Sequence, residues 1–139
     1  MSTIIQTQTT SFKKELYQAV HDFTTDTFKI ALYTANADLN AATTVYTTSN
    51  EVTGGGYVAG GIALTGVTIN SDGYTAYVNF NNAAFGAAVT ARCALIYNVT
   101  KANRSVAVLD FGSDKTFTSA NNTVTMPVNS STTALIRFP

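Results

Sequence analysis

The chain has 139 residues, of which 45% are hydrophobic and 12% charged, and its formal net charge is +0. This length and composition predict one globular domain and exclude a disordered segment. The eight basic residues form no cluster that could neutralise phosphates, and no run of about 18 apolar residues occurs, so neither a nucleic-acid nor a membrane partner is expected.

Residues 1–10 are predicted to form a flexible arm in front of a domain that spans residues 11–139. The segment is uncharged and rich in Thr and Gln, and Ile4 and Ile5 form its apolar pair. Arms of this kind stay mobile unless contacts hold them. Ile4 and Ile5 are therefore candidate contacts to a partner, with a frayed end as the alternative. The segment lacks the pattern of a secretion signal, so synthesis in the cytoplasm is expected.

A short helix is predicted over residues 12–22, with Ser11 as its cap. Its apolar stripe has helical spacing and consists of Phe12, Leu16, Val20 and Phe23. We expect this stripe to pack against a sheet. The single histidine, His21, is interpreted as a residue at the helix C-terminus that the helix dipole favours. A catalytic role is not expected, because the sequence has no Gly-x-Ser-x-Gly motif or similar nucleophile.

After the helix the apolar pattern changes to a period of two. Residues 27–34 predict a strand with Phe28, Ile30 and Leu32 on one face and Lys29, Ala31 and Tyr33 on the other. A loop over 35–52 follows, with one helical turn expected near 39–42. Further strands are predicted at 62–70, 74–80, 90–99, 104–112, 121–128 and 131–139.

Turn residues separate these strands and set the fold class. Asp72-Gly73 predicts a tight hairpin, and the four-residue loop 100–103 predicts a second one. Pro127 is expected at a sheet edge or a bulge. Seven or eight closely spaced strands after one helix predict a mainly β protein, an antiparallel β-sandwich or jelly roll. A doubly wound α/β fold would need helices between the strands.

The stretch "NEVTGGGYVAGG" raises the question of a phosphate-binding loop. Gly54-x-Gly56-x-x-Ala59 fits a relaxed dinucleotide motif, but a strand must precede such a motif and a helix must follow it. Here "TTSN" precedes it and a strand pattern follows. No Lys-Ser/Thr pair stands where a P-loop requires one. We therefore interpret the glycines as bends with positive φ and close backbone approach.

These bends make Gly54, Gly55, Gly56 and Tyr57 further candidate partner contacts. The ring of Tyr57 can either face a partner or pack into the core, and packing is favoured. The single cysteine, Cys93, lies in the strand pattern of residues 90–99 and is interpreted as a small buried hydrophobic residue. One Cys and one His are too few for a structural zinc site, and no calcium loop occurs, so neither a metal nor a cofactor is expected.

Four blocks of sequence resemble, in this order, a group of small virion structural proteins of tailed bacteriophages. The blocks are "SFKKELYQAVHDF", "DTFKIALYTANADL", "YTTSNEVTGGGYVAGG" and "ARCALIYNVTKANRSVAVLDFGSDK". The similarity spans residues 11–138 and depends on the ordered set. It carries no catalytic motif, so it implies a structural part of the particle and transfers no site residues.

Within that group, the size and the expected sandwich are most similar to capsid decoration or cement proteins, which clamp neighbouring major capsid subunits. The resemblance implies a non-enzymatic protein on the capsid surface of the virion. Its partner would be the major capsid protein, and a homodimer or another homo-oligomer is expected. A tail or collar component is the rival, and a carbohydrate-binding sandwich is the alternative from another class.

Overall fold

The period-two segments of the sequence form the central strands of the computed structural model, which describes residues 3–138. β7 (Thr90–Asn98) pairs antiparallel with β2 (Phe28–Tyr33) and with β8 (Arg104–Thr116). The predicted faces of β2 are confirmed, because its two sides bury residues in different hydrophobic clusters. Phe28, Ile30 and Leu32 enter the main core, and Ala31 and Tyr33 enter the second cluster.

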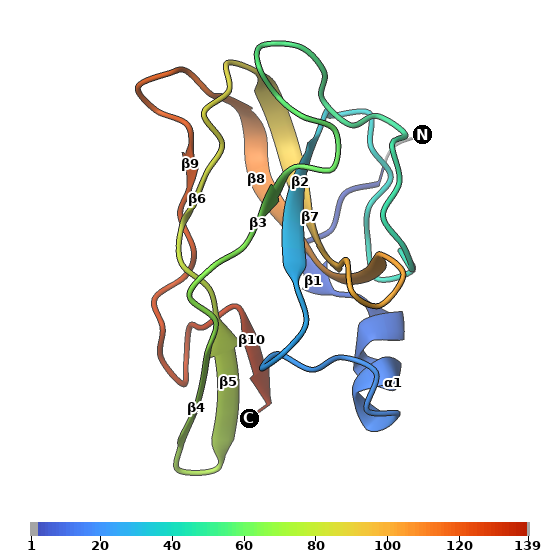
Figure 1. Cartoon of the computed structure of the whole chain (residues 1–139), viewed down its shortest axis with the longest axis vertical. Coiled ribbons are helices and arrows are strands. Elements are labelled where there is room, and N and C mark those ends of the chain that lie inside the picture. Colours follow the sequence, from blue (N-terminus) through green and yellow to red (C-terminus); the bar gives the residue numbers. More distant parts are fainter. Residues whose placement is uncertain (1–2, 139) are drawn as a thin grey trace.

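Short strands complete three antiparallel sheets around these long ones (Figure 1). The five-stranded sheet has the order β1-β8-β7-β2-β3, the three-stranded sheet β10-β5-β4 and the two-stranded sheet β6-β9. The remaining strands are β1 Thr7–Gln8, β3 Ile62–Ala63, β4 Thr68–Asp72, β5 Thr75–Asn79, β6 Ala83–Ala84, β9 Thr123–Val124 and β10 Ile136–Phe138. The fold is thus mainly β, as predicted, and no sheet of residues 3–138 closes into a barrel.

Both faces of the five-stranded sheet are covered. The main core combines residues of this sheet with residues of the two smaller sheets and their connections, such as Phe80, Phe85 and Ile136. The second cluster lies on the opposite face, where Leu39 and Tyr46 from the loop between β2 and β3 join Tyr33 and Tyr97. Because both faces are buried, β2 and β7 consist largely of apolar residues.

The helix is shorter than predicted and begins earlier. α1 spans Thr10–Tyr17, and the hydroxyl of Thr9 accepts a hydrogen bond from the backbone N–H of Phe12. The cap is therefore Thr9, and the predicted cap, Ser11, lies inside the helix. The chain leaves the helix at Gln18, and Ala19 has a φ of 58°, which a continuing helix does not allow. No helix of the described residues is long and apolar enough to cross a membrane.

Residues 4–10 of the predicted arm bond to β8 and to the loop around Leu39, and residues 1–2 lie outside the described residues. Thr7 and Gln8 pair with Val108 and Ala107 as β1. The backbone N–H of Ile5 donates to the carbonyl of Leu39. The predicted arm thus contains an edge strand that the local sequence does not reveal, because its backbone partners come from the edge of β8.

The Asp72-Gly73 hairpin exists, but its turn lies one residue later than the sequence suggested. Asp72 pairs with Thr75, so Gly73 and Tyr74 are the two turn residues. Gly73 has a φ of 60°, whereas Tyr74 is not among the residues with positive φ. A glycine at the first central position is typical of a type II′ turn, which needs positive φ there only. This arrangement places Tyr74 at the exposed tip of the hairpin.

Candidate functional site

The glycine-rich segment is a bend that presses against two neighbouring stretches of backbone. Gly54, Gly55 and Gly56 all have positive φ, which confirms the predicted conformation. A Cβ at Gly55 would lie 1.9 Å from the carbonyl oxygen of Ala88, and one at Gly61 would lie 1.8 Å from that of Ile30. β3 follows the segment, so the helix that a dinucleotide site requires does not begin here.

The buried carboxylate of Glu51 binds this segment through hydrogen bonds. Glu51 Oε1 accepts a hydrogen bond of 2.6 Å from the Tyr46 hydroxyl. Its Oε2 accepts bonds from the Tyr57 hydroxyl at 2.5 Å and from the backbone N–H of Gly60 at 2.8 Å. The Tyr57 oxygen in turn accepts from the N–H of Leu32 at 3.0 Å. The carboxylate is thus satisfied by neutral donors, and no ion pair of the described residues includes it.

Burial and the neighbouring carboxylate keep the surrounding tyrosines protonated. Burial, followed by the charge of Glu51, raises the pKa of Tyr97 to about 12. Burial also raises the pKa of Tyr33, Tyr46 and Tyr57 far above the usual range, with Glu51 again contributing. Protonated hydroxyls are the donors that a carboxylate needs. The arrangement therefore anchors the loop to β2 and offers no free base or nucleophile.

A second polar cluster surrounds the single histidine. His21 Nε2 lies 2.8 Å from Glu15 Oε1, and its Nδ1 lies 3.0 Å from the amide nitrogen of Asn98. The same amide nitrogen donates to Asp26, and the Asn98 oxygen accepts from the backbone N–H of Lys101. Because the amide nitrogen is a donor, Nδ1 acts as the acceptor and Nε2 carries the proton that is shared with Glu15.

The histidine cluster joins the chain after α1 to the turn between β7 and β8. Lys101 pairs with Asp26 at 2.9 Å, and Arg104 pairs with Glu15 at 3.1 Å. The His21 side chain is 0% exposed and lies beyond the end of α1. The interpretation of His21 as a residue at the helix C-terminus is therefore wrong. One partner, Glu15, is six residues away in the sequence and the other, Asn98, is 77 residues away, and these contacts indicate a structural role.

Burial alone would raise the pKa of Asp26, because its side chain is only 3% exposed. The hydrogen bonds from Asn98 and Lys101 outweigh this effect and hold the pKa below its ordinary value. Asp26 is therefore ionised at neutral pH and fixes both partners. Burial also raises the pKa of the Cys93 thiol to about 12, in keeping with a buried residue rather than a reactive thiol.

The candidate contact residues fall into two separate groups. Ile4 is half-buried against the second cluster, whereas Ile5 is 51% exposed. Gly54–Gly56 are exposed, but the ring of Tyr57 packs against Phe85 at 6.3 Å between centroids, so the favoured packing is confirmed. No hydrogen bond of the described residues links Ile4 or Ile5 to this segment. Ile5 and the three glycines are thus the members that a partner can reach.

The sequence did not reveal an exposed apolar surface on the three-stranded sheet. We use the name hairpin patch for four exposed side chains: Ile69, Tyr74 and Phe138 of this sheet and its turn, and Val128 of the segment that leads to β10. Tyr74 is 102% exposed, and Ile69 and Phe138 are 53% and 49% exposed. Figure 1 shows the β4–β5 hairpin extending past the end of the five-stranded sheet. Because this end has no layer opposite it, apolar side chains there remain in solvent. Tyr74 beside the turn glycine was the one local signal.

Within residues 3–138, no group of Cys, His, Asp and Glu side chains is arranged to hold a metal ion. Comparison of the chain with models of protein families, with characterised proteins and with solved structures gives no match. Within each of the two polar clusters, the donors and acceptors form hydrogen bonds with one another. The hairpin patch is therefore the feature of the described surface that points most directly to a partner.

Proposed function

We propose that the protein is a structural component of a bacteriophage virion, a capsid decoration or cement protein that binds the shell of the major capsid protein. The hairpin patch is the observation that carries the proposal. Exposed apolar side chains on neighbouring strands and their connections are typical of protein–protein contact surfaces. The ordered sequence blocks that resemble virion structural proteins support the same role.

The proposed mechanism is stabilisation by mass action. A protein that binds the assembled shell and not its free subunits shifts the equilibrium toward the shell. Docking Ile69, Tyr74 and Phe138 in a seam between subunits would remove their apolar surface from water. This role requires no reacting group. The side chains of Glu51 and His21 form hydrogen bonds inside the fold.

The test removes apolar surface from the patch and measures binding to particles. In the double variant Ile69→Asp and Tyr74→Ser, we expect unchanged folding but at least about tenfold weaker retention on particles that lack the wild-type protein. Tyr17→Ser is the matched control, because Tyr17 is 94% exposed at the end of α1. Retention is measured by co-sedimentation. Equal retention of the double variant and the control would contradict the role of the patch.

Copy number separates the cement role from a tail or collar component. A cement protein occurs in many copies, in fixed ratio to the major capsid protein, whereas a tail component occurs in few. Gel densitometry of purified particles measures this ratio. A low ratio would favour the tail, and sedimentation of the free protein would test the expected homo-oligomer.

The carbohydrate-binding alternative has one observation in its favour. Tyr17 and Tyr74 are nearly fully exposed, and exposed aromatic rings provide platforms for sugar rings. The two side chains lie on different elements, α1 and the β4–β5 turn. Glycan-array binding that is lost in Tyr74→Ser would support this alternative.

A further inference from the structure

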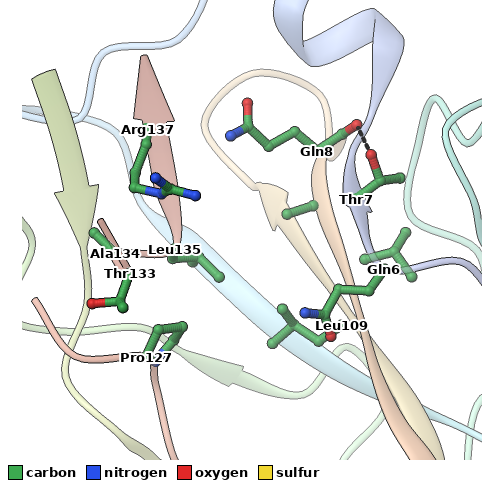
Figure 2. A pocket seen from close by; sticks show the side chains of 11 residues that line it. Gln6, Thr7, Gln8, Leu109, Pro127, Thr133, Ala134, Leu135 and Arg137 are labelled. Atoms are coloured by element: carbon green, nitrogen blue, oxygen red, sulfur yellow. Dashed lines mark hydrogen bonds between the residues drawn. The ribbon is translucent and has the colours of Figure 1, made fainter. Parts of the chain in front are cut away.

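Along one side of the structure, the five-stranded and three-stranded sheets are not hydrogen-bonded to each other. β1 is the outermost strand of the five-stranded sheet and pairs only with β8. β10 is the outermost strand of the three-stranded sheet and pairs only with β5. A groove with a volume of about 330 Å³ lies between these elements (Figure 2). Each side of the groove therefore carries a strand with one free edge.

The floor of the groove is apolar and continues into the main core. Leu109 of β8 and Leu135, which precedes β10, are half-buried and pack against that core. They come from opposite sides of the groove, as Figure 2 shows. An apolar side chain that enters from outside would therefore extend the main core at its open end.

The rim of the groove is polar and carries a positive charge. Gln6, Gln8 and Thr133 supply amide and hydroxyl groups, and no carboxylate of residues 3–138 lines the groove. Arg137 is exposed and forms no ion pair with the described residues. Its one hydrogen bond reaches the carbonyl of Ser131 at 3.5 Å, the limit for such a bond. Among the described residues the guanidinium thus has no acidic partner, and it can bind an acidic group from outside.

The backbone at this edge also has an acceptor that an added strand could use. The carbonyl of Gln8 accepts a hydrogen bond of 2.9 Å from the hydroxyl of its own neighbour, Thr7 (Figure 2). A hydroxyl is a replaceable partner, because it rotates about one bond. Free strand edges bind extended peptides through backbone hydrogen bonds, and alternate side chains then point to opposite sides.

We propose that this groove binds an extended acidic segment of a partner protein. Apolar side chains of the segment contact Leu109 and Leu135, and a carboxylate between them pairs with Arg137, whose planar guanidinium binds carboxylates through two parallel hydrogen bonds. The proposal depends only on the residues and strand edges of the groove. It holds whether or not the protein belongs to a virion, and the hairpin patch is not part of the groove.

The probe is a synthetic peptide of alternating valine and glutamate, blocked at both ends. The readout is the amide chemical shifts of the isotope-labelled full-length protein during titration by NMR. We expect saturable shifts at Gln8 and Arg137. A peptide with glutamine in place of glutamate should bind at least about tenfold more weakly, which corresponds to about 1.4 kcal/mol.

Charge reversal gives the decisive comparison. Arg137→Glu should lose the acidic peptide and bind its lysine counterpart, whereas Lys13→Glu, the same charge change on the exposed side of α1, should bind as the wild type does. The amide spectra also report whether both variants are folded. Absence of saturable shifts in the wild type, or equal binding by both variants, overturns the proposal. If the same amides shift with protein concentration alone, a second copy occupies the groove and the proposal fails.

Discussion

Two glycines with nearly the same φ should respond very differently to a methyl group. Gly54 has a φ of 81° and nothing within 4 Å of the position that a Cβ would occupy, whereas Gly61 has a φ of 78° and the carbonyl oxygen of Ile30 at 1.8 Å from that position. Gly54→Ala carries only the cost of an alanine at positive φ, about 1–2 kcal/mol of unfolding free energy. Gly61→Ala carries the same cost and must also displace the backbone of β2.

The extra cost follows from where that backbone lies. The oxygen of Ile30 must move by about 1 Å to reach the 3.0 Å that real Cβ contacts keep, and Ile30 pairs with Ile96 and Ile62 in the five-stranded sheet. Overpacking a rigid core costs about 1–3 kcal/mol. We therefore expect Gly61→Ala to lose about 2–5 kcal/mol in total, a large part of the stability of a domain this size.

Urea unfolding measures both variants. The midpoints should separate while the slope stays constant, and linear extrapolation then gives the two free energies of unfolding. Gly61→Ala should be less stable than Gly54→Ala by about 1–3 kcal/mol. If both variants lost the same free energy, the close approach to β2 would carry no energetic weight, and positive φ alone would explain the glycines.

Tyr57→Phe should destabilise the protein by about 2–3 kcal/mol in urea unfolding, because the N–H of Leu32 loses its acceptor and Glu51 loses a donor; a loss below about 0.5 kcal/mol would contradict the role of the cluster. Asp26 has a lowered pKa in the folded protein, so its contribution to the free energy of unfolding should be complete above its unfolded pKa of 3.8. This contribution should disappear as the pH falls through the lower pKa of the folded protein. The stability gap between wild type and Asp26→Asn should therefore shrink on acidification, and a constant gap would count against this explanation. Cys93 should react with a thiol reagent only when the protein unfolds, because the thiol is buried and its pKa is raised; rapid labelling of native protein would disprove the assignment.

The faces of the long strands could be predicted because they depend on local alternation. In β7, Leu95 and Tyr97 enter the second cluster while Ala94 and Ile96 enter the main core, as the period of two implies. The fold class followed from the number of such segments and the turns between them. The helix end could not be predicted, because Ala19 carries no local sign of its positive φ.

The polar clusters were missed because their members come together only through the fold. Asn98 meets His21 across 77 positions, and Tyr97 meets Gly60 across 37. One local signal existed. Glu51 stands as the single acid beside the glycine-rich segment, with tyrosines five positions before it and six after it. An acid among uncharged neighbours, with hydroxyl donors close to it in the chain, is a pattern that sequence reading can use.

The pairing of β1 with β8 also constrains the order in which the chain can fold during synthesis. Thr9 bonds to Ser105 across 96 positions, so β1 leaves the ribosome long before the strand that pairs with it. β7 and β8, by contrast, meet across one short turn and can form at once. Closing the long loop costs entropy that only the later contacts offset. The N-terminal strand, made first, is therefore among the last elements to find its place.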